Sequence, residues 1–151
     1  MIAAQDLTLA LEDRRILDGV SFDIARGESV ALIGANGSGK TSILRCLLGF
    51  VPFGGRVTIE GHDVVRSPIV ARSLVGYVPQ RAAFGDARAG DVLGFVAALR
   101  RLDRARIAAM LALVGLAGHA DERVRTFSGG MLQRLALAVA LLPNPPVLLF
   151  D

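Results

Sequence analysis

The sequence predicts an α/β fold with a mostly parallel central sheet, and three observations support this prediction. Short apolar runs that suit buried strands alternate with segments of helical periodicity. Glycine and proline stand between these segments, where turns are expected. The chain has 151 residues, enough for one domain with a sizeable core. We therefore expect a single α/β domain.

Two strands are expected close to the N-terminus. Residues 2–11 and 17–24 alternate roughly between apolar and polar side chains, which is typical of antiparallel strands. Asp18-Gly19 and Arg26-Gly27 are turn signals. The sequence therefore predicts an antiparallel part before the parallel core.

Strands and helices then alternate along the chain. Residues 30–33 form a continuous apolar run, which predicts a buried strand. A glycine-rich turn over 34–39 precedes a helix expected over 40–49, where glycine ends it. Residues 56–60 and 73–78 predict two more strands.

The pattern becomes helical over residues 86–123. The apolar side chains fall on two shared faces: Val92, Val96 and Leu99 on one, and Ile107, Met110, Leu111 and Val114 on the other. Ser128 can cap another helix that runs to about residue 142, where prolines end it. Residues 147–150 then predict a final buried strand.

The apolar content of 52% raises the question of a membrane span. Uninterrupted apolar stretches such as 95–99 and 135–142 are far shorter than the ~20 residues that cross a bilayer. The first residues lack the basic segment and apolar block of a secretory signal. Cys46 lies in an apolar helical stretch and is the only cysteine, so it predicts a buried thiol in a reducing compartment. We interpret the chain as cytosolic.

The charge is basic, with a net value of +3, and comes almost entirely from arginine. A nucleic-acid-binding face is one explanation of this charge and compositional bias is another. The arginines are scattered and alternate with acidic residues, and the chain has one tyrosine and no tryptophan for base stacking. Nucleic acid is therefore not an expected partner.

One segment fits the pattern G-x-x-x-x-G-K-[ST], from Gly34 to Thr41. Its glycines let backbone amides approach a phosphate, and the helix that follows adds its positive end. Lys40, the only lysine, supplies a compact charge for the outer phosphates, and the Thr41 hydroxyl suits a magnesium shell. A glycine turn with a chance lysine is the alternative. The order of strand, loop and helix favours a site for a nucleoside triphosphate with magnesium.

A second helix start carries Ser128-Gly129-Gly130. A serine cap followed by two glycines presents a hydroxyl and uncovered amides, which together can bind an anion. Taken alone, the tripeptide fits an ordinary capped helix equally well.

Several segments resemble those of the ATP-binding subunits of ABC transporters. Residues 127–134, FSGGMLQR, resemble the signature motif of that family, Val78-Pro79-Gln80 resembles its Q-loop, and residues 147–151 resemble its Walker B strand. They follow the phosphate loop in the family's order. The residues around Leu17-Asp18-Gly19 and Arg26-Gly27-Glu28 match the family's lead-in to that loop. The resemblance covers the whole chain.

The resemblance implies a P-loop NTPase fold with a RecA-like core of about residues 1–80 and 127–151 and a helical subdomain of about 81–126. It implies that Gln80 and Asp151 act in catalysis and bind Mg²⁺ together with Thr41. It implies that two subunits enclose ATP between them, the signature of one facing the phosphate loop of the other. The residues expected to bind ATP are Gly34, Asn36, Gly37, Ser38, Gly39, Lys40, Thr41, Ser42, Ser128, Gly129 and Gly130.

The chain departs from the family pattern in three places. An aromatic residue usually stacks on adenine, but the matching stretch contains Leu11. Met131 replaces a glutamine in the signature, which is more typical of exporters. Asp151 is the last residue, so the catalytic glutamate and switch histidine expected after it do not follow. We therefore expect a fragment of a longer protein, inactive by itself, and interpret His62 and His119 as surface residues.

The resemblance implies an ATPase that moves a substrate through separate transmembrane subunits, on the inner face of the cell membrane. Residues 80–102 are expected to dock those subunits; the alternative is that their apolar stripe packs inside the helical subdomain. One alternative is a soluble ABC ATPase that acts on ribosomes or DNA, but the interval between Lys40 and Ser128 carries no long insertion of the kind those proteins have. Another is a nucleotide-binding module without turnover.

Overall fold

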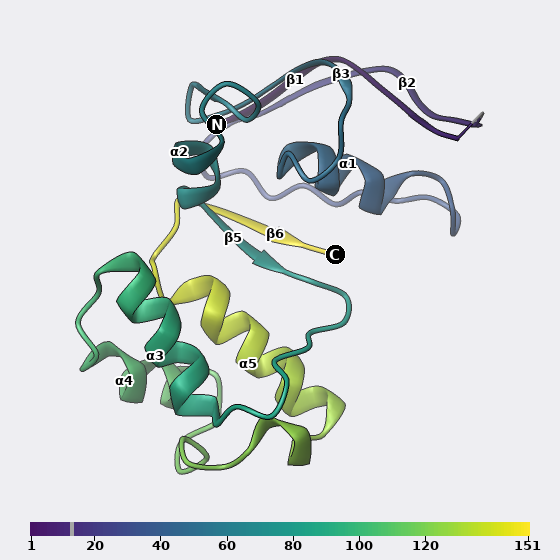
Figure 1. Ribbon diagram of the computed structural model, residues 1–151. Coiled ribbons are helices and arrows are strands. Elements are labelled where there is room, and N and C mark those ends of the chain that lie inside the picture. Colours follow the sequence, from purple (N-terminus) through teal and green to yellow (C-terminus); the bar gives the residue numbers. More distant parts are fainter. Residues whose placement is uncertain (13) are drawn as a thin grey trace. The chain divides into compact units, whose positions relative to one another are not determined.

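The computed structural model describes residues 1–12 and 14–151, which form two compact units, Met1–Leu74 and Val75–Asp151 (Figure 1). The first unit is built around an antiparallel sheet, and the second contains a parallel strand pair with three α-helices. The predicted α/β class with an antiparallel N-terminal part is confirmed. The predicted boundaries between a RecA-like core and a helical subdomain stay a prediction.

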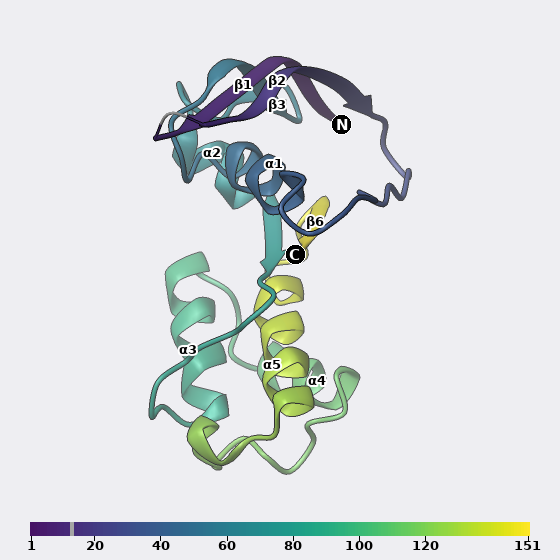
Figure 2. The same ribbon diagram turned by 90° about the vertical axis from the view of Figure 1, so that its right-hand side faces the viewer.

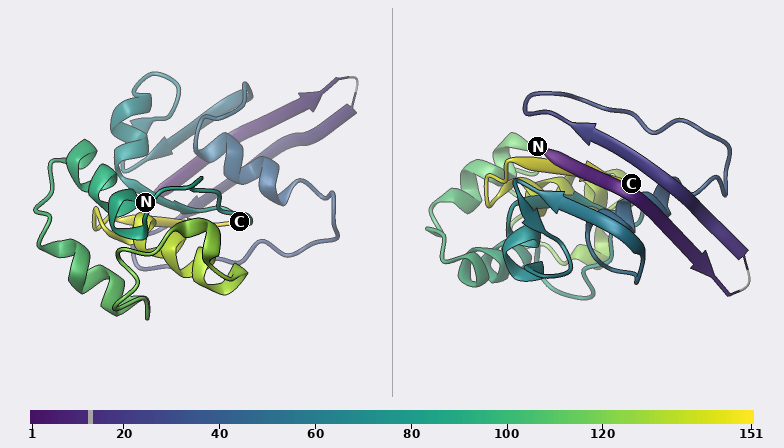
Figure 3. Two further views of the ribbon diagram at one scale, coloured as in Figure 1. Left: turned by 60° about the horizontal axis from the view of Figure 1, so that its bottom comes forward. Right: turned by 90° about the horizontal axis from the view of Figure 1, so that it is seen from above.

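The sheet of the first unit has the strand order β2-β1-β3-β4, and all its pairs are antiparallel. Figure 3 shows β1, β2 and β3 side by side. The strands are β1 (Ile2–Leu11), β2 (Arg14–Ile24), β3 (Gly54–Ile59) and β4 (His62–Asp63). The strands expected over 2–11, 17–24 and 56–60 are thereby confirmed.

The turn predicted at Asp18-Gly19 is wrong, because both residues lie inside β2. Leu7 pairs with Val20 and Leu9 with Leu17, so β2 has one residue more than β1 over this stretch. This is a β-bulge, and Gly19 takes a positive φ of 67° within it. A glycine signal in a strand therefore marked a bulge and not a reversal.

One face of this sheet is buried against helix α1 (Lys40–Leu47) (Figure 2). Leu7 and Ile59 are among the side chains buried on that face, and α1 contributes Leu44 and Leu47. Cys46 is free and 0% exposed, as expected from the sequence. The short helix α2 (Pro68–Ser73) was not expected and takes the first residue of the strand predicted over 73–78.

The strand predicted over residues 30–33 is wrong. These residues belong to no strand, and Ile33 is 94% exposed. A parallel strand needs a neighbour for its backbone hydrogen bonds. No strand among the described residues pairs with this run, so its apolar pattern alone does not make it part of a sheet.

The second unit contains two parallel strands, β5 (Val75–Val78) and β6 (Val147–Phe150), in the register Val75↔Val147 to Val78↔Phe150. β6 is buried on only one face, because Leu148 and Phe150 are exposed. The expectation of a fully buried final strand is therefore half right.

Three helices pack together in the second unit: α3 (Ala89–Arg100), α4 (Arg106–Leu113) and α5 (Gly129–Leu141) (Figure 2). A 3-10 helix, η1 (Val124–Thr126), precedes α5. The fully buried leucines of this group are Leu93, Leu116, Leu135 and Leu142. Leu111 of α4 and Val114, the residue that follows this helix, face the same cluster, as the sequence predicts.

The buried face of α3 differs from the face that the sequence predicts. Its buried residues are Ala89, Leu93, Gly94 and Ala97, three of them spaced four apart, whereas Leu99 is 68% exposed. Alanines let neighbouring helices approach closely, so the buried line follows the small side chains and not the largest ones. Val92 and Val96 are half-buried at its edge.

Helix α5 packs closely on β5. A Cβ added to Gly76 would lie 2.4 Å from the carbonyl oxygen of Ala140 and 2.8 Å from Leu148 Cδ2. Only glycine allows this approach. Val78, Ala136 and Ala140 form the small core there.

Within the described residues, none of the helices is both long and apolar enough to cross a membrane.

Candidate functional site

The glycine-rich loop over residues 34–39 is the candidate phosphate site. Residues 34–38 are exposed, and Gly37 and Gly39 have positive φ angles of 80° and 94°. A Cβ on Gly39 would lie 3.2 Å from Leu17 Cδ2 and 3.4 Å from Ile16 Cγ2. Gly39 is therefore required both by its backbone angle and by its contact with β2.

Lys40 closes this loop. Its Nζ donates hydrogen bonds to the carbonyl oxygens of Gly34 and Ala35, each at 2.8 Å. The ammonium group therefore lies against the backbone of the loop. A turn bond from the Ser38 amide to the Ala35 carbonyl, 3.2 Å long, shapes the same stretch.

Helix α1 begins at Lys40 with Gly39 as its N-cap residue. No described side chain caps it, and its first turn contains no acidic residue that would neutralise the positive end. Thr41 and Ser42 lie in this turn and are partly exposed. Residues 34–42 thus combine exposed loop amides, a helix N-terminus and the Lys40 ammonium group. This combination suits an anion-binding site.

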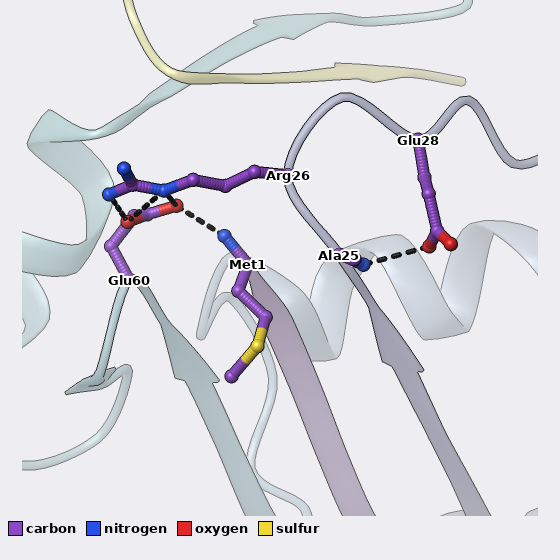
Figure 4. A network of polar contacts seen from close by, with 5 residues as sticks. All are labelled: Met1, Ala25, Arg26, Glu28 and Glu60. Atoms are coloured by element: carbon purple, nitrogen blue, oxygen red, sulfur yellow. Dashed lines mark hydrogen bonds and ion pairs between the residues drawn. The ribbon is translucent and has the colours of Figure 1, made fainter.

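The turn that leads from β2 toward the loop is held by an ion-pair network (Figure 4). The Arg26 guanidinium and the N-terminal amine both bind the Glu60 carboxylate, which joins the start of β1 to the residue after β3. The hydrogen bond from Arg26, with that from the amine, lowers the pKa of Glu60 to about 2. Glu28 closes the turn by accepting from the Ala25 amide at 2.8 Å.

Ser128 caps α5 as the sequence predicts, with its Oγ accepting from the Met131 amide at 3.3 Å. Gly129 and Gly130 are exposed, and a Cβ on either would meet no described atom within 4 Å. Packing among the described residues therefore does not require glycine at these two positions. Their bare backbone leaves room for an approaching ligand.

Gln80 and Asp151 follow the two parallel strands at the same end. Gln80 comes two residues after β5, and Asp151 comes directly after β6. The Asp151 amide donates to the Val78 carbonyl at 3.0 Å, and the Tyr77 hydroxyl donates to Asp151 Oδ2 at 3.2 Å. The carboxyl ends of parallel strands are where α/β proteins bind ligands.

A side chain of α5 reaches the residue expected in the Q-loop. Gln133 Nε2 donates to the backbone carbonyl of Gln80 at 2.7 Å. Sequence reasoning did not find this contact, nor that of Tyr77 with Asp151. Each joins residues that are far apart in the sequence, and no local pattern indicates them.

The loop after Gln80 is tied to the segment before Ser128. Asp86 binds Arg123 at 2.6 Å and Arg125 at 3.1 Å, and the Val124 amide donates to the Ala87 carbonyl at 2.9 Å. These contacts therefore link the loop after the candidate Q-loop to the segment that precedes the candidate signature.

The structure divides the predicted residues between its two units. Gly34 to Ser42 form the loop and helix start of the first unit. Gln80, Asp151 and Ser128 to Gly130 belong to the second unit, at two strand ends and one helix start.

The described residues contain no group of three or more His, Cys, Asp or Glu side chains that could hold a metal ion. Magnesium bound with a nucleotide usually needs only one or two carboxylates, because phosphates and waters complete its shell. For such a shell the first unit offers the Thr41 hydroxyl, and the second unit offers the Gln80 amide and the Asp151 carboxylate.

Both histidines fall outside these groups. His62 is exposed, as expected. His119 is half-buried, with its ring edge-to-face on Phe127 at 6.2 Å and Nδ1 3.0 Å from Glu122 Oε1. It is therefore less of a surface residue than the sequence indicates.

Comparison with known proteins identifies the family of this chain. The sequence model of the ABC transporter family matches residues 17–151. The chain belongs to the ABC transporter family.

Two relatives and one solved structure illustrate the likeness. The chain is 32% identical to the linearmycin resistance ATP-binding protein LnrL of Bacillus subtilis, over 100% of this chain and 50% of that protein. It is 37% identical to the Fe(3+) ions import ATP-binding protein FbpC of Pasteurella multocida, over 99% of this chain and 44% of that protein. A structure of an ATP-binding subunit of an ABC transporter superposes with a TM-score of 0.91 at 27% identity, covering 99% of this chain and 65% of that one.

Membership in this ABC family implies nucleotide binding. The chain spans about half the length of the curated relatives that it matches. The relatives include both a resistance protein and an import protein at comparable identity. The lean toward export drawn from Met131 therefore stays a prediction.

Proposed function

We propose that the protein carrying this chain binds and hydrolyses ATP with Mg²⁺ and couples the hydrolysis to movement of a substrate through separate transmembrane subunits. The observation that carries the proposal is the loop closed by Lys40 at an uncapped helix start. The family and the names of its relatives support transport over a role on ribosomes or DNA.

The phosphate loop holds the nucleotide in this proposal. Backbone amides from Gly34 to Gly39 surround the phosphates, and Lys40 neutralises their charge. The side chains of Asn36, Ser38 and Ser42 lie on the loop and the first helical turn, where they can add hydrogen bonds. Leu11 is 46% exposed and is positioned in the sequence to contact adenine through apolar surface.

Magnesium, when bound with the nucleotide, offsets negative charge on the phosphates. Thr41, Gln80 and Asp151 are proposed as its ligands. The hydrogen bond from Tyr77 supports this assignment for Asp151, because it orients the carboxylate at the strand end. Gln80 also places the attacking water. Positioning and electrostatic stabilisation together make up almost all of what a protein contributes to phosphoryl transfer.

A second copy of the subunit is proposed to complete the site. Ser128, Gly129 and Gly130 face the phosphates held by the other copy, so that ATP lies between two subunits. The open backbone at both glycines supports this, since packing within the described chain does not require them.

The proposed docking face for the transmembrane subunits lies within residues 80–102. Phe95 and Leu99 support it, because they are 70% and 68% exposed on a helix whose other face is buried. Docking there would hold the protein on the inner face of the membrane. The ion pairs of Asp86 tie this region to the signature segment.

Residues 1–151 alone are proposed to hydrolyse ATP negligibly. In the family pattern, a glutamate after the Walker B aspartate polarises the water, and a positioned general base contributes roughly 10²–10⁴ in rate.

Replacing Lys40 tests the proposal. In the full-length protein, Lys40→Ala should weaken ATP binding by about 10- to 100-fold, the effect of losing a charged hydrogen-bond donor, and should slow phosphate release. Calorimetry and phosphate-release assays measure the two effects. Arg45→Ala is the matched control, because it removes one positive charge from the exposed side of the same helix.

The control variant should bind ATP like the wild type. Unchanged affinity and unchanged phosphate release in Lys40→Ala would show that the loop is not the nucleotide site.

A further inference from the structure

Gln133 makes a contact that the proposed function does not use. Its side chain leaves the exposed surface of α5, and its Nε2 donates to the backbone carbonyl of Gln80 at 2.7 Å. This is at the short end of the range for N–H···O hydrogen bonds. The two residues are 53 positions apart, so the bond joins two separate parts of the second unit.

The accepting segment has little regular structure of its own. Residues 79–86 belong to neither a helix nor a strand. A loop of this kind has no ladder of backbone bonds to fix its conformation, so a side-chain donor from a packed helix can decide where its backbone lies. α5 is such a helix, with Leu135, Ala136 and Ala138 buried.

The donor also has a defined place on its helix. Gln133 lies just over one turn after Ser128, the residue that caps α5. The same helix therefore begins at the proposed phosphate contact and fixes the backbone of the proposed magnesium ligand. Asp86 strengthens this link from the far side of the loop, through Arg123 and Arg125.

We infer that Gln133 is a positioning residue for Gln80: its amide fixes the backbone from which the Gln80 side chain reaches the metal and the water. This inference rests on the proposed function. Gln133 touches no reacting atom in this scheme and acts only through Gln80.

A double-mutant cycle separates positioning from simple stabilisation. The bond ends on the Gln80 main chain, so Gln80→Ala keeps the acceptor while removing the side chain that is positioned. A bond that only stabilises the fold has the same effect on kcat whether or not the Gln80 side chain is present. A positioning bond loses its effect on turnover once the Gln80 side chain is gone.

The experiment measures kcat and KM for ATP at saturating Mg²⁺ in the full-length protein, for wild type, Gln133→Ala, Gln80→Ala and the double variant. Gln133→Ala should lower kcat by about threefold to tenfold, the usual worth of one hydrogen bond, with little change in KM. In the Gln80→Ala background the same change should leave kcat the same. Gln133→Glu, which replaces the donor by an oxygen, should behave like Gln133→Ala, and Gln133→Lys should recover part of the loss.

Arg134→Gln is the matched control. Arg134 Nη1 also donates from α5 to a backbone carbonyl, that of Gly115, at 3.0 Å. Its loss should lower the melting temperature and give the same change in kcat in both Gln80 backgrounds.

Equal effects of Gln133→Ala on kcat in both backgrounds, or no effect in the wild-type background, would overturn the inference while leaving the proposed function intact. A wild-type protein without ATPase activity, or one unaffected by Lys40→Ala, would instead overturn the proposed function.

Discussion

Gly39 meets two requirements of the phosphate loop, a positive φ angle and a close contact with β2. Its φ of 94° is strained for any residue with a side chain, and a Cβ would press on Leu17 and Ile16. Gly39→Ala should therefore weaken ATP binding and destabilise the first unit by about 1–3 kcal/mol. Calorimetry and urea denaturation measure the two effects.

Gly61→Ala controls for strain alone. Gly61 has a φ of 81°, but a Cβ there meets no described atom within 4 Å. Its substitution should cost stability without loss of ATP affinity. If both variants bound ATP like the wild type, Gly39 would not shape the loop.

The residues predicted best from the sequence are those fixed by local geometry. Lys40 and the Ser128 cap bond to neighbours a few positions away, so a motif indicates them. Tyr77 contacts Asp151 across 74 positions, which no local pattern reveals. The roles assigned to the site residues stay predictions.

Among the elements, the approach of α5 to β5 depends on Gly76. In Gly76→Ala, the new Cβ would meet the Ala140 carbonyl oxygen at 2.4 Å, and a backbone atom cannot move aside as a flexible side chain can. We expect a loss of at least about 1–3 kcal/mol in the free energy of unfolding, measured by urea denaturation.

Gly94→Ala is the matched control in the same unit. The atom nearest its Cβ, at 3.2 Å, is the end of the flexible Arg104 side chain. Alanine also favours a helix over glycine, so this variant should be as stable as the wild type or more so. Equal losses in both variants would mean that close packing at Gly76 is not the cause.

Elements whose partners are near in the sequence were predicted well. β1 and β2 form a hairpin, and α5 has a cap, so local pattern sufficed for both. The run 30–33 failed because a parallel strand exists only through its neighbours. The buried face of α3 was displaced because close helix packing selected its alanines.

At the scale of the whole molecule, the ion pairs of Glu60 connect β1, β3 and the turn after β2, and their contribution to stability depends on pH. Its pKa in the folded protein is about 2, below the usual 4.5, mainly because of the hydrogen bond from Arg26. A lowered pKa means that the carboxylate stabilises the fold above about pH 4.5 and loses this effect as the pH falls toward 2.

Glu60→Gln should therefore be less stable than the wild type at pH 6, and the difference should vanish toward pH 2. Urea midpoints measured across that range test this. Arg26→Gln should reduce the same pH dependence, and adding it to Glu60→Gln should have little further effect. A difference that stayed constant with pH would exclude the ion pair as its cause.

Family membership is also a property of the whole chain. The motif order indicated the ABC transporter family, which the match over residues 17–151 shows. The comparison does not favour import or export, because a resistance protein and an import protein both match nearly the whole chain at comparable identity.

The position of Lys40 has a chemical consequence. It is the only lysine among the 151 residues, and its amine lies against the carbonyls of the phosphate loop. Within this chain, acylation of a side-chain amine by a cell or by a reagent can therefore occur at Lys40 alone. A single adduct there would remove the charge of the loop, and its rate of formation would report how accessible the loop is.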